Sequence, residues 1–109
     1  MTDWIRVCAS SDLLPGESTV AWVGDTPVLV CNLDGALHAL EDRCSHEDFE
    51  LSAGTFDTRD GTVECVLHGA RFDVRTGEPR CAPAYTAVPR YAARRADDAV
   101  WVSTEPVDG

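Results

Sequence analysis

Two short segments of this 109-residue chain each combine a cysteine with a histidine. Residues 44–46 read Cys-Ser-His, and residues 65–69 read Cys-Val-Leu-His-Gly. Thiolate and imidazole are the commonest protein ligands of iron and zinc, so two segments with one of each predict a single metal site built from two loops. The ligand set predicted from these residues is Cys44, His46, Cys65 and His68.

The order of the ligand types distinguishes two kinds of metal centre. Zinc sites usually keep like ligands together, as in Cys-x2-4-Cys followed by His-x3-5-His. Here the pairs are mixed. A [2Fe-2S] cluster accepts this mixture if Cys44 and Cys65 bind one iron while His46 and His68 bind the other, which is Rieske ligation. A Cys2His2 zinc site stays open as the alternative, as do core cysteines beside surface histidines without a metal.

The residues around the second segment carry a wider resemblance. Residues 64–73 read Glu-Cys-Val-Leu-His-Gly-Ala-Arg-Phe-Asp, and Thr-Gly-Glu-Pro follows at residues 76–79. With the Cys-x-His, the 18-residue spacer and the Cys-x-x-His, this run resembles the second cluster loop of bacterial Rieske-type ferredoxins. The resemblance covers nearly the whole chain and implies one cluster, with His46 and His68 near the surface. Val66 departs from the family, which commonly has proline there.

Other positions gain meaning only through this resemblance. Pro83 resembles the proline of a third loop that covers the cluster, although a proline that merely ends a strand is an equal alternative. Respiratory-type relatives join their two cluster loops by a disulfide at the positions of Phe49 and Leu67, so this chain cannot form it. High-potential relatives carry serine and tyrosine at Ala70 and Phe72, which implies a potential at the low end of the Rieske range, roughly -150 to +300 mV.

The length bounds the function. We expect residues 1–109 to form one domain, which leaves no room for a second catalytic domain. The sequence contains no nucleotide-binding glycine loop and no nucleophile with its base, so we predict no catalytic residues and a carrier in place of an enzyme. The resemblance implies a one-electron carrier between a flavin-dependent ferredoxin reductase and a terminal non-haem iron oxygenase. Service to nitrite reductase or cluster assembly stays open, and so does a zinc-stabilised interaction module.

Charge indicates the kind of partner. The net charge is -10, and residues 1–64 contain 13 acidic residues against 3 arginines. Such a chain is repelled by nucleic acid and anionic membranes and attracted to basic docking patches. We expect an acidic docking surface at the first ligand segment, formed by Glu41, Asp42, Glu47, Asp48 and Glu50. The N-terminus lacks a signal-peptide pattern and no apolar run reaches 18 residues, so we expect a soluble, cytoplasmic monomer.

Short strands between regular turn signals predict an all-β, Rieske-type sandwich or partly open barrel of antiparallel strands. Hairpins are expected about Asp34-Gly35 and Asp60-Gly61, because such dipeptides favour two-residue turns. We expect a small cluster-binding subdomain at about residues 43–70, with both ligand pairs at hairpin tips. A strand is expected from residue 85 to residue 94, and residues 105–109 are expected to be a loose tail.

Several residues are assigned structural roles. Trp22 and Trp101 are expected in the core or half-buried. His38 stands apart from other ligand types, which favours an ordinary strand position. The cysteines outside the ligand set are expected to be small, partly buried residues. These are Cys8, Cys31 and Cys81.

Overall fold

The computed structural model describes residues 3–43, 50–65, 69–80 and 87–107. Strands dominate this part of the chain, together with two short 3-10 turns. The strands are β1 (Trp4–Ala9), β2 (Ser18–Val23), β3 (Thr26–Leu33), β4 (Ala36–Glu41), β5 (Thr55–Asp57), β6 (Thr62–Glu64), β7 (Arg71–Asp73), β8 (Arg90–Ala96) and β9 (Ala99–Pro106), and the 3-10 turns are η1 (Ser10–Asp12) and η2 (Leu51–Ala53).

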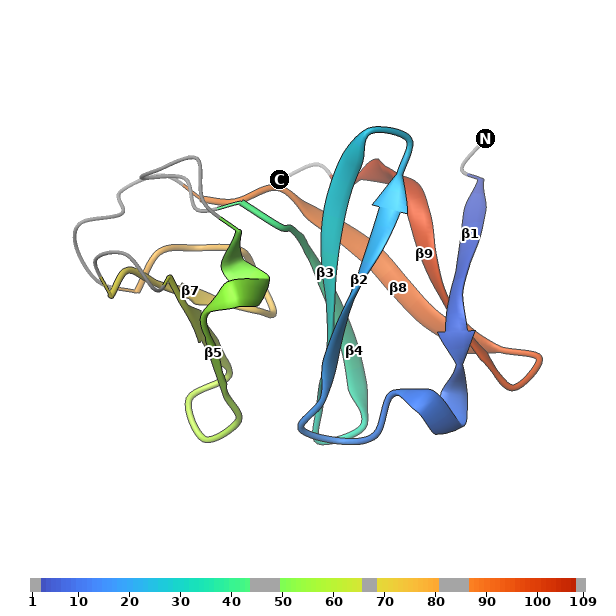
Figure 1. Ribbon diagram of the computed structural model, residues 1–109, viewed down its shortest axis with the longest axis horizontal. Helices are drawn as coiled ribbons and strands as arrows, with labels where there is room; N and C mark the ends of the chain where they lie inside the picture. The colour runs from blue at the N-terminus through green and yellow to red at the C-terminus, as the bar shows by residue number, and fades with distance from the viewer. Residues whose placement is uncertain (1–2, 44–49, 66–68, 81–86, 108–109) are drawn as a thin grey trace.

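The larger sheet has six antiparallel strands in the order β1-β9-β8-β4-β3-β2. Its edge strands β1 and β2 also contact each other, so the sheet curls into a nearly closed barrel (Figure 1). Closure of this kind hides sheet edges that would otherwise pair with other chains. The predicted all-β fold is confirmed.

The smaller sheet contains β5, β6 and β7, also antiparallel. It lies beside the barrel and faces β3 and β4 (Figure 1). The chain leaves the barrel after β4 and returns to it at β8. All the predicted ligands therefore belong to the excursion that builds this second sheet.

Local turn chemistry forms the hairpins where the sequence predicts them. Asp34 and Gly35 join β3 to β4 with φ of 53° and 96°, as a type I′ turn requires. Asp60-Gly61 lies in the turn from β5 to β6, where the Gly61 N–H donates to the Asp57 carbonyl at 2.9 Å. Both expected hairpins are confirmed.

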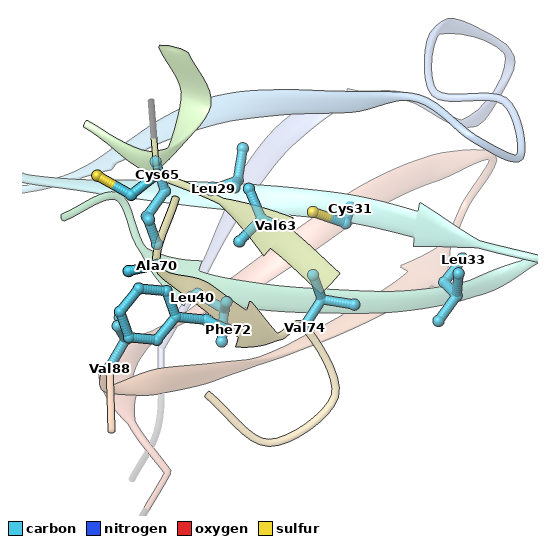
Figure 2. Packing of buried hydrophobic residues seen from close by; sticks show 11 residues of the cluster. Leu29, Cys31, Leu33, Leu40, Val63, Cys65, Ala70, Phe72, Val74 and Val88 are labelled. Atoms are coloured by element: carbon cyan, nitrogen blue, oxygen red, sulfur yellow. The ribbon is translucent and has the colours of Figure 1, made fainter. Parts of the chain in front are cut away.

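Strand alternation divides the apolar side chains between two cores. One fills the barrel, and the other lies between the barrel and the smaller sheet, which we call the interface core (Figure 2). The buried barrel residues are Leu13, Ala21, Val28, Val30, Ala39, Val100 and Val102. The buried interface residues are Leu29, Cys31, Leu33, Leu40, Leu51, Val63, Cys65, Ala70, Phe72, Val74 and Val88. Neighbouring residues of β3 thus point into different cores.

The tryptophans differ from each other. Trp101 is half-buried, as expected, and its indole N–H donates to the Ala96 carbonyl at 2.9 Å. Trp22 is 62% exposed, so its expected burial is wrong. Val20, two residues earlier on the same face of β2, packs against the interface core, whereas Trp22 lies beyond that core at the end of an edge strand.

The C-terminal strand is longer than expected. β9 runs to Pro106, which pairs with Tyr91, and the Val107 N–H donates to the Arg90 carbonyl at 2.7 Å. The expectation of a loose tail is therefore wrong for residues 105–107. β8 begins at Arg90, and residues 87–89 of the expected strand are irregular.

Candidate metal centre

The second ligand segment is carried by the β6–β7 hairpin. Cys65 directly follows β6, its N–H donates to the Ala70 carbonyl at 2.7 Å, and its carbonyl accepts from the Gly69 N–H at 3.1 Å. Gly69 has a φ of 73°, which glycine adopts without a Cβ penalty. These bonds close a tight turn, so Cys65 is at a hairpin tip as predicted. His68 lies outside the described residues.

The first ligand segment has a different setting. Cys44 and His46 lie outside the described residues, but the chain on both sides of them is described. It runs from β4 of the barrel to β5 of the smaller sheet, and these strands belong to different sheets. The expectation that both ligand pairs lie at hairpin tips is therefore wrong for the first pair, because its segment crosses between two sheets.

A close backbone approach joins the end of the first segment to the start of the second. A Cβ on Gly54 would lie 1.7 Å from the carbonyl oxygen of Glu64, so only glycine fits there. Glu64 is the last residue of β6, and it pairs with Thr55. The chain that follows the first ligand segment is thus held against the residue that precedes Cys65.

The start of the first segment is anchored as well. The Asp42 N–H donates to the Pro27 carbonyl at 2.8 Å, and its side chain is only 3% exposed. Both carboxylate oxygens accept hydrogen bonds from Ser52, one from the N–H and one from the hydroxyl. The sequence predicted Asp42 to be part of an exposed acidic surface. This prediction is wrong, because Asp42 is buried. Glu50 is exposed, Glu41 is half-buried, and Glu47 and Asp48 lie outside the described residues.

The predicted third loop begins and ends beside the same sheet. At its start, the Arg80 N–H donates to the Arg71 carbonyl of β7 at 2.7 Å. After it, the Val88 N–H donates to the Gly77 carbonyl at 2.8 Å, and a Cβ on Gly77 would lie 2.2 Å from the Val88 carbonyl oxygen. Pro83 lies outside the described residues. The chain on both sides of it is nevertheless fixed against the β7 side of the hairpin that carries Cys65.

Charged side chains reinforce this side of the smaller sheet. Arg71 pairs with Glu64 across β6 and β7 at 3.1 Å. Asp73 pairs with Arg75 at 2.9 Å and with Arg80 at 3.1 Å. Burial raises the pKa of Asp73, but the hydrogen bonds from Arg75 and Arg80 outweigh it and hold the pKa below its usual value. This network adds charged contacts to short strands that pack on the interface core on one face.

The surroundings of Cys65 fit an iron–sulfur ligand. Its side chain is 1% exposed and belongs to the interface core with Ala70 and Phe72. Figure 2 shows its sulfur turned outward from the labelled side chains of that core. A sulfur shielded from water suits a cluster, whose potential and stability depend on solvent access. The complete predicted set of two thiolates and two imidazoles matches Rieske ligation.

The remaining described cysteines differ from Cys65. Burial, aided by the negative charge of Asp42, raises the pKa of Cys31 to about 12. Burial also raises the pKa of Cys8, which is half-buried in β1. Both thiols are protonated at neutral pH, which disfavours metal binding. The expected partial burial is confirmed for Cys8, whereas Cys31 is fully buried; both lie in strands. Cys81 lies outside the described residues.

His38 is an ordinary strand residue, as predicted. It lies in β4 opposite Cys31, and burial together with the positive charge of Arg75 lowers its pKa. Across the described ranges, no group of three or more His, Cys, Asp and Glu side chains could hold a metal ion. No helix in the same ranges is long and apolar enough to span a membrane. The positions expected of the respiratory-type disulfide, Phe49 and Leu67, lie outside them.

Comparison with proteins of known structure and function agrees with this arrangement. The ferredoxin component of biphenyl 2,3-dioxygenase from Rhodococcus jostii (strain RHA1) is 41% identical over 100 residues, 92% of each chain. The ferredoxin subunit of anthranilate 1,2-dioxygenase from Burkholderia cepacia is 35% identical over 103 residues, 94% of each chain.

Solved structures show the same fold. The ferredoxin of carbazole 1,9a-dioxygenase from Nocardioides aromaticivorans IC177 superposes with a TM-score of 0.86 at 32% identity, over 91% of this chain and 95% of that one. A chain in a complex of reduced oxygenase and oxidized ferredoxin of carbazole 1,9a-dioxygenase has a TM-score of 0.89 at 34% identity, over 97% of both chains. The family model of the Rieske [2Fe-2S] domain matches residues 3–92 of the sequence, and the chain therefore belongs to that family.

Proposed function

We propose that this chain carries single electrons to a terminal non-haem iron oxygenase from a flavin-dependent ferredoxin reductase. Its relatives are named as ferredoxin components of dioxygenase systems, and one similar chain was solved in complex with an oxygenase. A bound [2Fe-2S] cluster supplies one-electron oxidation and reduction. The observation that carries the proposal is the convergence of the bases of three loops on the hairpin of Cys65.

The ligand roles follow from the types of donor. We assign Cys44 and Cys65 to one iron and His46 and His68 to the other. Cys65 is 1% exposed and lies at the edge of the interface core. Imidazole is neutral and thiolate is anionic, so the histidine-bound iron is the one with the less negative ligands. The cluster-binding subdomain, expected at about residues 43–70, includes the described strands β5 and β6.

We further propose a cytoplasmic monomer whose partners present basic docking patches. The support for basic docking patches is the net charge of -10 and the exposed Glu50 next to the first ligand segment. Opposite charges on two partners accelerate encounter more than they tighten binding. Nucleic acid and membrane surfaces, which are anionic, are not expected partners.

The test begins with the purified protein. Iron and acid-labile sulfide in equal amounts, with two of each per chain, are expected for a [2Fe-2S] cluster. Cys65→Ser and His68→Ala should abolish its visible absorption, because each removes a ligand. His38→Ala is the matched control, since His38 is a strand residue, and it should keep the absorption. Zinc without sulfide, or cluster loss in His38→Ala with a normal cluster in His68→Ala, would contradict the assignment.

Reconstitution then tests the carrier role. Reductase and oxygenase components of the biphenyl and anthranilate systems are mixed with this protein, and oxygenated product is measured. Product that depends on the protein, and that is absent with Cys65→Ser, is expected. A protein that holds a reducible cluster but never supports product would overturn the oxygenase partner while leaving the cofactor assignment intact.

A further inference from the structure

A buried carboxylate closes the base of the first ligand segment. Asp42 accepts hydrogen bonds from the Ser52 N–H at 2.6 Å and from the Ser52 hydroxyl at 2.6 Å, one on each carboxylate oxygen. Asp42 is two residues before Cys44, and Ser52 is six residues after His46. The two ends of the segment that contains both ligands are therefore tied directly to each other.

We propose that this Asp42–Ser52 clasp is a positioning device for the metal centre, which orients the first ligand segment relative to Cys65. The inference rests on the proposed function, because it takes Cys44 and His46 as ligands. It adds a role for two residues that the ligand pattern does not include.

The energetics favour a firm clasp. A buried carboxylate is costly unless hydrogen bonds compensate it, and Asp42 is 3% exposed. Hydrogen bonds to a charged acceptor are shorter and roughly twice as strong as those between neutral groups. Both of these bonds end on one residue, which restricts the direction as well as the distance between Asp42 and Ser52.

The clasp is also attached to fixed structure on both sides. On the barrel side, the Asp42 N–H donates to the Pro27 carbonyl of β3 at 2.8 Å. On the other side, Leu51 is fully buried beside Ser52, and Gly54 is held against the Glu64 carbonyl. Glu64 immediately precedes Cys65. The clasp therefore fixes the first ligand segment relative to Cys65, and its loss is expected to change their relative position.

A purely structural role is the competing explanation, and Asp57 provides a matched control. Its carboxylate accepts from the N–H groups of Arg59 at 2.9 Å and Asp60 at 3.3 Å. Asp57 is the last residue of β5, before the turn to β6 and at the other end of these strands from Cys65. Asp57→Asn thus perturbs a carboxylate cap that is less buried than Asp42, at a site away from the ligand segments.

The experiment compares Ser52→Ala, Asp42→Asn, the conservative Ser52→Thr and the control Asp57→Asn. The half-time of cluster loss to an iron chelator is followed by visible absorption, and the reduced protein is examined by electron paramagnetic resonance and protein-film voltammetry. The free energy of unfolding of each apoprotein is measured in urea. Ser52→Ala and Asp42→Asn are expected to accelerate cluster loss on the order of tenfold and to shift the resonance and the potential. Ser52→Thr keeps the hydroxyl group, so it is expected to retain the parent's rate of cluster loss, resonance and potential.

Asp57→Asn is expected to lower the stability of the apoprotein while leaving the rate of cluster loss, the resonance and the potential unchanged. The proposal is overturned if Ser52→Ala and Asp42→Asn lower stability as Asp57→Asn does but keep the parent release rate and potential. If Asp42→Asn does not fold, Ser52→Ala decides, because it removes only one hydroxyl. A parent protein that contains zinc and no sulfide would overturn the proposed function. The rate of zinc release from the same variants would then test the clasp. A release rate equal to that of the parent would overturn the clasp proposal.

Discussion

The barrel and the smaller sheet are stabilised in different ways. Barrel strands are six to eight residues long and enclose an apolar core. The strands of the smaller sheet have three residues each, and they are held by the interface core on one face together with ion pairs and close backbone contacts. A sheet of such short strands has little stability of its own. The geometry of the metal centre therefore depends on a few individual contacts, whereas the barrel spreads its stability over many.

Substitution of Gly54 should have the largest effect among changes to the scaffold. A Cβ there would lie 1.7 Å from the Glu64 carbonyl oxygen, so Gly54→Ala must separate two backbones. We expect the free energy of unfolding to fall by about 3 kcal/mol or more, with loss of the cluster. Urea unfolding and visible absorption measure these effects.

Gly24 provides the barrel comparison. It has a φ of 62°, and a Cβ there would meet no described atom within 4 Å. Gly24→Ala should cost about 1 kcal/mol, from backbone strain alone. Similar losses for the two substitutions would show that the smaller sheet adapts as easily as a barrel turn, which would break the comparison.

Removing the charge of Asp73 should have an intermediate effect. Arg75 and Arg80 hold its pKa below the usual value despite partial burial, so the charged form stabilises the folded state. Asp73→Asn is expected to lower the free energy of unfolding at pH 7 by about 1–3 kcal/mol. The difference should begin to shrink as the pH falls below about 4, where the unfolded chain takes up the proton. It should vanish once the pH lies below the lowered pKa of Asp73 in the folded parent.

Chemical denaturation between pH 2 and pH 7 tests this dependence, with Asp25→Asn as the control. Asp25 is exposed in the β2–β3 turn of the barrel. Its substitution should change little at any pH. A loss for Asp73→Asn that stays constant down to pH 2 would contradict the charge mechanism.

Hydroxyl groups added next to Cys65 should raise the reduction potential. Ala70 and Phe72 are fully buried in the interface core, and the Ala70 carbonyl accepts from the Cys65 N–H. If Ala70→Ser or Phe72→Tyr donates to a cluster sulfur, a gain of about 1 kcal/mol in the reduced state raises the potential by roughly 40 mV. Protein-film voltammetry measures the shift.

Val100→Thr sharpens this prediction, because it adds a hydroxyl to the barrel core instead. It should lower stability and leave the potential unchanged. An equal shift in Val100→Thr would assign the effect to general polarity. A parent potential well above zero would show that other groups set its value.

The smallest effect is expected from the acidic residues beside the first ligand segment. Neutralising Glu47, Asp48 and Glu50 together should slow electron transfer to the oxygenase a few-fold, as added salt should, since charges are screened over roughly 10 Å at 0.1 M ionic strength. Stopped-flow reduction of the oxygenase at several salt concentrations measures it. As a control, neutralising Asp12, Asp25 and Asp97 on the barrel should change the rate less. A rate that responds neither to salt nor to neutralisation of the residues beside the first ligand segment would contradict the docking proposal.

Local sequence determines the parts of this molecule that depend on a few adjacent residues. Asp34-Gly35 and Asp60-Gly61 form their turns because the turn conformations select these residue types. The position of Cys65 at a hairpin tip follows in the same way, from the strand before it and the glycine-containing turn after it. The ligand pattern was therefore sufficient to indicate the family, and its full set of ligands stays a prediction.

Tertiary structure alone decides what covers each strand and where distant segments meet. Alternation in β2 does not reveal that the smaller sheet covers Val20 and leaves Trp22 in solvent. The acidic run around the first ligand segment likewise does not reveal that Asp42 turns inward to Ser52. Residues far apart in sequence settle these outcomes, because burial depends on which surfaces pack together and hydrogen bonds depend on where the partner lies.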